Sequence, residues 1–64
     1  GKIGMICFRR LTSTDKSVGI LYVNFTNVSY IEGTDDYTYI HFSDDSEPIT
    51  VKESVESIID LLSE

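Results

Sequence analysis

The spacing of apolar residues changes once along this chain, near Glu53, and this change constrains the fold more than any other feature. Before Glu53, apolar and polar side chains alternate, which is typical of strands with one buried face. After it, the apolar residues follow the i, i+3, i+4, i+7 stripe of an amphipathic helix: Val55, Ile58, Ile59 and Leu62. Strands followed by one helix predict an α+β fold, in which a small antiparallel β-sheet of four to five short strands is closed by one C-terminal amphipathic helix.

The expected strands are separated by residues that favour turns. We predict strands at residues 5–8, with Leu11 as an extension, and at residues 20–25, 28–32, 37–43 and 49–51. The connections are a polar loop at residues 12–17 and turns at residues 33–36 and 44–47. Because Pro48 has no N–H to donate, we expect the strand that follows it to lie at an edge of the sheet.

The length of the chain limits it to one small domain. It has 64 residues and a mass of 7.2 kDa. We interpret residues 1–64 as a single small α+β domain, and residues 1–4 as either a cloning remnant or an extension upstream of Met5. A domain of this size buries only about 60% of the surface that its unfolded chain exposes, so a minimal core is expected.

Residue usage argues against metal, cofactor and membrane sites. The single cysteine, Cys7, cannot form an internal disulfide, which favours a reducing, cytoplasmic location and a small buried thiol. One cysteine and one histidine are too few for the usual zinc ligands, and residues 44–47 lack the spacing of a calcium loop. The apolar runs are far shorter than a membrane helix needs. We therefore expect no metal, no cofactor and no membrane partner.

The only histidine, His41, is the one candidate for acid–base catalysis. In a strand, its neighbours on the same face are Tyr39 and Ser43. Catalysis by a Ser–His pair also needs an orienting acid and an oxyanion hole, and the sequence has no glycine-rich nucleophile elbow. The sequence therefore predicts a protein that is not an enzyme and has no catalytic residues.

The net charge of −6 is unevenly distributed. Residues 1–16 carry +3 and residues 17–64 carry −9, a balance that argues against direct binding of nucleic acid. Six carboxylates form the acidic segment: Glu32, Asp35, Asp36, Asp44, Asp45 and Glu47. They either keep a small domain soluble or form the surface of an acidic decoy that occupies a basic, nucleic-acid-binding partner. The decoy needs one continuous surface, whereas the two turns are expected roughly 23 Å apart, at about 3.3 Å per residue.

Aromatic residues mark the expected interaction face. One helix can cover only one face of a small sheet, so the other face must contact solvent or another protein. The face that we predict for this contact carries Tyr22, Tyr37, Tyr39 and His41. Aromatic side chains supply contact area at a small entropic cost. We therefore expect a bacterial or phage interaction module whose partner is a protein, and which forms a homo-oligomer.

Two short resemblances to known families are visible. The runs "YIE" and "YTYIH" at Tyr30 and Tyr37, followed by the helix that ends near Leu62, resemble the first half of a LytTR DNA-binding domain. That likeness implies a fragment of a transcriptional regulator. If such a fragment binds DNA, the basic residues that this chain offers for it are Lys2, Arg9, Arg10 and Lys16. The family's DNA-contacting loops have no counterpart in this sequence, so no DNA-contacting residue is carried over.

Residues 5–62 also resemble the small FlbD-like flagellar family, most specifically in the "VKESVE" run that begins at Val51. Further matching positions lie along the chain: Met5-Ile6, Leu11-Thr12, Val23-Asn24, Val28, Ile31-Glu32, Asp36, Ile49-Thr50 and Ile58-Ile59. The longer loop at residues 12–18 and the Tyr37/Tyr39 pair depart from the family's pattern. This likeness implies a small, β-rich bacterial accessory protein and assigns no catalytic residue.

Overall fold

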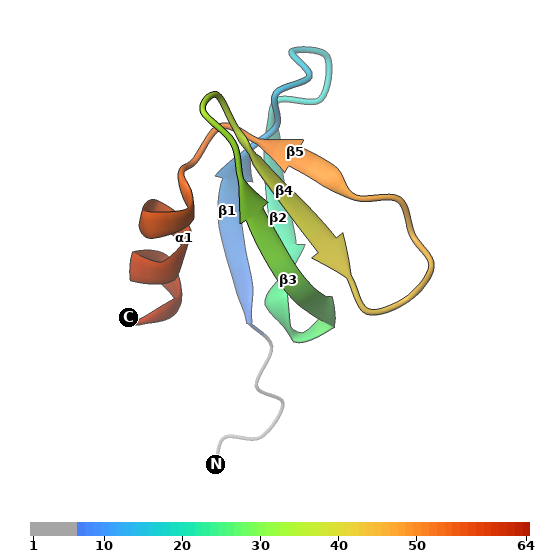
Figure 1. The fold of residues 1–64 in the computed structure, drawn as a ribbon, viewed down its shortest axis with the longest axis vertical. Helices are drawn as coiled ribbons and strands as arrows, with labels where there is room; N and C mark the ends of the chain where they lie inside the picture. Colours follow the sequence, from blue (N-terminus) through green and yellow to red (C-terminus); the bar gives the residue numbers. More distant parts are fainter. Residues whose placement is uncertain (1–6) are drawn as a thin grey trace.

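The computed structural model describes residues 7–64, which form five strands, one short 3-10 helix and one α-helix (Figure 1). In chain order, the elements are β1 (Phe8–Thr12), β2 (Ile20–Asn24), the 3-10 helix (Phe25–Asn27), β3 (Val28–Gly33), β4 (Thr38–Phe42), β5 (Ile49–Val51) and α1 (Val55–Leu62). The α+β fold class and the single C-terminal helix are thereby confirmed.

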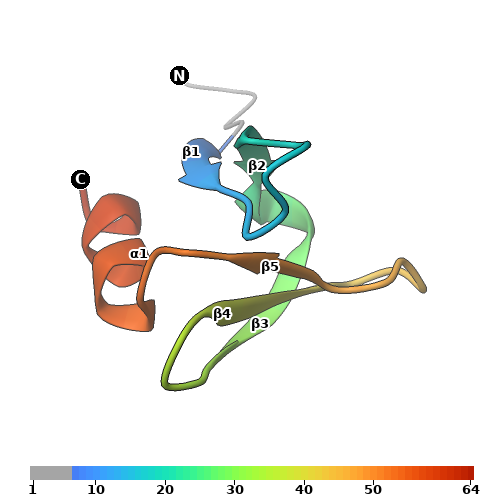
Figure 2. The same cartoon turned by 90° about the horizontal axis from the view of Figure 1, so that it is seen from above.

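The strands form two antiparallel sheets rather than one. β1 pairs with β2, and the second sheet has the order β3-β4-β5. Figure 2 shows the two sheets as facing layers, with α1 at one side. The 3-10 helix joins the layers where β2 turns into β3, and a bridge between Ser13 and Val51 joins them at the other end. The apolar side chains can therefore be enclosed between two very small sheets. One flat sheet of this size would leave them exposed.

β5 lies at the edge of its sheet, as Pro48 predicted, and part of its outer side is bonded to the end of β1 and the residues that follow it. The Lys52 N–H donates to the Thr12 carbonyl at 2.8 Å, and the Thr14 N–H donates to the Thr50 carbonyl at 3.1 Å. β5 is the last strand of its sheet, but β1 covers part of its free side. Pro48 lies one residue before the strand begins, where no ladder bond is needed.

Five elements each contribute one residue to the core. The buried apolar residues, each 5% exposed or less, are Leu11, Val23, Ile40, Val51 and Ile58. Its members come from β1, β2, β4, β5 and α1, so the core forms only when both sheets and the helix are in place. Leu21, Phe25, Val28, Ile31, Phe42, Ile49 and Leu61 pack around it and are partly buried.

The first strand extends past the apolar run from which it was predicted. It spans Phe8–Thr12 and includes Arg9 and Arg10, while Met5 and Ile6 lie outside the described residues. Arg9 fits on the inner side of β1 because its Nε donates to the Leu61 carbonyl at 3.1 Å. A long arginine stem can line the edge of a core while its head group bonds elsewhere. A count of apolar residues therefore does not reveal that Arg9 belongs to the strand.

β4 is shorter than predicted, by one residue at each end.

The helix buries only part of the predicted stripe: Val55 and Ile58 face the sheets, whereas Ile59 and Leu62 do not. Ser54 caps its N-terminus, where the Ser54 hydroxyl accepts the Ser57 N–H at 3.1 Å. Ile58 is fully buried and Leu61 packs against the core, whereas Ile59 and Leu62 are 52% and 38% exposed. Arg9 of β1 donates to the Leu61 carbonyl in the last turn, and the covered face is centred on Ile58. Within residues 7–64, no helix has the length and hydropathy to cross a lipid bilayer.

Candidate protein-binding surface

Four aromatic rings are in contact along the outer face of β3 and β4. We call this set, Tyr30, Tyr37, Tyr39 and His41, the aromatic row. Tyr30 and His41 are cross-strand partners whose rings stack at 4.1 Å with an interplanar angle of 6°. The ring of Tyr39 lies 6.1 Å from that of His41, and Tyr37 meets Tyr39 edge-on at 5.4 Å. Such contacts limit the orientations open to the rings, which lowers the entropic cost of binding a partner.

The alternation of β4 produces this row. Thr38 and Ile40 point into the core and are 1% and 0% exposed. Tyr39 and His41 therefore point outward, as the period of two predicts. The Thr38 hydroxyl donates to the Glu53 carbonyl at 2.7 Å, so the buried side of the strand also has its polar group satisfied.

Glu32 anchors the centre of the row. Its Oε1 lies 2.6 Å from Nε2 of His41, and the Ser29 hydroxyl donates to the His41 carbonyl at 3.2 Å. The His41 ring is thus held by a stacked ring on one side and a carboxylate at its edge. At the end of the row, the Tyr39 hydroxyl, as a hydrogen-bond partner and a nearby titrating group, raises the pKa of Tyr37 from its usual 10.0.

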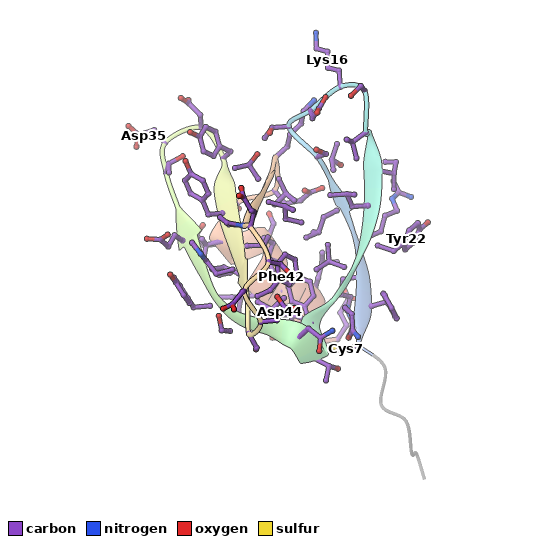
Figure 3. The ribbon with its side chains drawn as sticks, turned by 90° about the vertical axis from the view of Figure 1, so that its right-hand side faces the viewer. Cys7, Lys16, Tyr22, Asp35, Phe42 and Asp44 are labelled. Carbon is purple, nitrogen blue, oxygen red and sulfur yellow. The ribbon has the colours of Figure 1, made fainter. Side chains whose placement is uncertain are left out.

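Tyr22, the fourth residue of the predicted face, lies elsewhere. It is on β2, paired with Arg10 of β1, and is 66% exposed on the outer side of the other sheet (Figure 3). The predicted face therefore combined residues from two surfaces. Tyr30 takes the place of Tyr22 in the row, and only the β3–β4 register, which pairs Tyr30 with His41, could have identified it.

The outer side of the β1–β2 sheet is a second exposed surface with apolar side chains. Phe8 and Ile20 are 47% and 49% exposed there, on the same outward side as Tyr22. Arg10 lies among them, and Lys16 is at the far tip of the β1–β2 loop (Figure 3). Of the basic residues assigned to the regulator hypothesis, Arg9 is bound to the helix, and Lys2 lies outside the described residues.

The six acidic residues are divided between the two ends of β4. Asp35 and Asp36 are in the β3–β4 turn, whereas the other end carries Asp44, Asp45 and Glu47. Figure 3 shows Asp35 and Asp44 well separated. The sixth acid, Glu32, contacts the aromatic row between them. This arrangement matches the separation expected from the strand pattern and does not favour one continuous acidic surface.

The exposed carboxylates are organised by local turns. The Ser17 hydroxyl and N–H both donate to Asp15 Oδ1, at 2.7 Å and 2.9 Å, and they hold the pKa of that carboxyl below its usual 3.8. Ser46 lowers the pKa of Asp44 in the same way, with its N–H 2.8 Å from Oδ1. Hydrogen bonds within each turn therefore account for the presence of both aspartates and for their lowered pKa values.

Among residues 7–64, no three His, Cys, Asp or Glu side chains converge as metal ligands would. Cys7, which we expected to be a small buried thiol, is a free thiol that lies half-buried just before β1. No family model, curated protein or solved structure matches the chain. The resemblances to the FlbD-like and LytTR families remain predictions, as does the absence of catalytic activity.

Proposed function

We propose that this chain is a non-enzymatic protein-binding module that pairs with a second copy of itself through the aromatic row. The observation that supports the proposal most strongly is the unbroken contact from Tyr37 to Tyr30 on a sheet face that α1 does not cover. The stacked rings are already ordered, so a partner that packs on them meets a surface with little freedom left to lose. Tyr30 remains 54% exposed despite its stacking on His41.

A second copy fits the chemistry of this face. In a twofold-symmetric pair, each aromatic row packs on its own equivalent, and apolar ring surfaces are complementary to themselves. The net charge of −6 on each copy opposes the pairing. Salt screens that repulsion, so the proposed dimer strengthens as salt is added. A complex with a basic partner would instead weaken as salt is added.

Sedimentation equilibrium at several protein concentrations and two salt concentrations tests the proposal. We expect a mass near twice 7.2 kDa at low micromolar concentration, with more dimer at the higher salt. Tyr39→Ala should shift the equilibrium toward the monomer. The matched control is Tyr22→Ala, which removes an equally large and more exposed ring from the other sheet and should leave the mass unchanged. Circular dichroism of both variants is the check that each is folded.

A monomer at every concentration and salt would overturn self-association. A dimer that Tyr22→Ala abolishes and Tyr39→Ala leaves intact would move the interface to the outer side of the β1–β2 sheet. Either result rejects the aromatic row as the contact surface.

A further inference from the structure

A groove of about 420 Å³ runs beside β2, on the side of the molecule away from the aromatic row. Its apolar floor includes Leu21, Phe42 and Ile49, and the β4–β5 loop forms its far wall. Figure 3 looks into this region, where Phe42 and Asp44 lie between β4 and β2. The volume is within the range of about 300–1,000 Å³ that is typical of ligand pockets.

The wall that β2 contributes is a strand edge rather than a strand face. Four consecutive residues, 21–24, line the groove. A strand that presents one face contributes alternate residues, because successive side chains point to opposite faces. Consecutive lining residues therefore indicate that the backbone itself borders the groove.

The ladder between β1 and β2 shows which backbone groups face this edge. The Ser13 N–H donates to the Gly19 carbonyl at 2.7 Å, and the Phe25 N–H donates to the Cys7 carbonyl at 2.9 Å. Because hydrogen-bonded and non-hydrogen-bonded pairs alternate in an antiparallel ladder, the pair Arg10 and Tyr22 is of the second kind. The N–H and carbonyl groups of Tyr22 consequently point away from β1.

Ile20 lies two residues before Tyr22, and its pair with Thr12 is also non-hydrogen-bonded. Its N–H and carbonyl therefore also face the free edge of β2. Within residues 7–64, no backbone group pairs with β2 on this side. A strand edge of this kind is a template for an added strand. The equivalent edge of β1, in contrast, is occupied at Thr12, whose N–H and carbonyl bond to Glu53 and Lys52.

The rim of the groove is acidic. Asp44 and Glu47 both line it, and no lysine or arginine is among its described lining residues. The whole chain carries a net charge of −6. Positive charge on a ligand therefore favours its binding in the groove.

We propose that the groove binds an extended basic peptide, which adds as a strand to the free edge of β2 and places lysine or arginine side chains near Asp44 and Glu47. Main-chain hydrogen bonds to Ile20 and Tyr22 hold the peptide, and alternate apolar side chains rest on Leu21 and Phe42. The site is separate from the aromatic row, so it does not depend on the proposed dimer.

The probe is a fluorescein-labelled nonapeptide, acetyl-Thr-Lys-Val-Lys-Val-Lys-Val-Lys-Thr-amide, titrated with the full chain and followed by fluorescence anisotropy. We expect saturable binding that weakens as salt is added. Backbone hydrogen exchange should slow at Ile20 and Tyr22 when the peptide is bound, because these amides gain acceptors.

Two comparisons separate strand addition from simple charge attraction. The same peptide with N-methyl groups on alternate residues keeps its charge but loses main-chain donors, and we expect its affinity to fall about tenfold. Asp44→Asn with Glu47→Gln should weaken binding about threefold. The control variant, Asp35→Asn with Asp36→Asn, makes the same charge change at the other end of β4 and should change the affinity less.

Three results would overturn the proposal. One is the absence of saturable binding, and another is equal binding of the N-methylated peptide. The third is protection of Ile20 and Tyr22 in the protein alone as its concentration rises, which would assign this edge to a second copy of the chain.

Discussion

Both carboxylate oxygens of Glu53 bind one residue, Thr12. Oε1 accepts the Thr12 N–H and Oε2 accepts the Thr12 hydroxyl, each at 2.9 Å. The next residue back, Lys52, donates its N–H to the Thr12 carbonyl at 2.8 Å. All the polar groups of Thr12 that face β5 are therefore satisfied by the segment that leads into α1. This contact joins the end of one sheet to the start of the helix, across 41 positions of sequence.

Removing this contact should be costly, because it leaves a part-buried N–H without an acceptor. We expect Glu53→Ala to lower the free energy of unfolding by about 1–3 kcal/mol. Thr12→Val, which keeps the N–H, should cost less. In a double-mutant cycle measured by urea unfolding, the two residues should couple by about 0.5–3 kcal/mol. Glu64→Ala, at the exposed end of the chain, is the control and should have no effect. A coupling near zero would contradict the proposed role of Glu53.

Two neighbouring isoleucines in α1 test which face of the helix is buried. Ile58 is fully buried, whereas Ile59 is 52% exposed. Ile58→Ala should lower the free energy of unfolding by about 2–5 kcal/mol, because it leaves a cavity in the core. Ile59→Ala makes the same chemical change and should cost less than about 0.5 kcal/mol. Urea unfolding followed by circular dichroism measures both, and equal losses would restore the stripe predicted from sequence.

The stacking of Tyr30 on His41 should appear as coupling between the two side chains. A double-mutant cycle with Tyr30→Ala and His41→Ala, measured under conditions where the chain is monomeric, should give about 0.5–1.5 kcal/mol. The control cycle pairs Tyr30→Ala with Tyr22→Ala on the other sheet, and these effects should add. Equal coupling in both cycles would show that the stacked contact has no special contribution.

The hydrogen bonds between Ser17 and Asp15 predict that the free energy of unfolding depends on pH. Because hydrogen bonds from Ser17 lower the pKa of folded Asp15 below 3.8, their stabilising effect is present above the pKa of the unfolded chain and is lost as the pH falls through the lowered value. Ser17→Ala should return the pKa of Asp15 toward 3.8 in an NMR titration, although the turn retains the donor N–H. The stability difference between the two proteins should be present at neutral pH and shrink in acid. An unchanged Asp15 pKa would rule out the serine hydroxyl as the main cause.

The candidate site was only partly predictable. Tyr37, Tyr39 and His41 share a face because residues two apart in a strand always do, and this required no knowledge of the partner strand. Tyr30 joins them only because the β3–β4 register places it opposite His41, past an irregularity between Val28 and Tyr30. A shift of register by one residue would move Tyr30 to the other side of the sheet.

The sequence by itself determined the local elements, because hydrophobic period, turn residues and the Ser54 cap act over a few neighbouring positions. It could not decide how the strands divide into two sheets, which stripe of α1 is buried, or that Arg9 belongs beside the core. Those outcomes depend on contacts such as Arg9 with Leu61 and Thr12 with Glu53, whose partners are 52 and 41 residues apart. Only the folded chain brings such groups within hydrogen-bond distance, so tertiary structure decided where each surface lies.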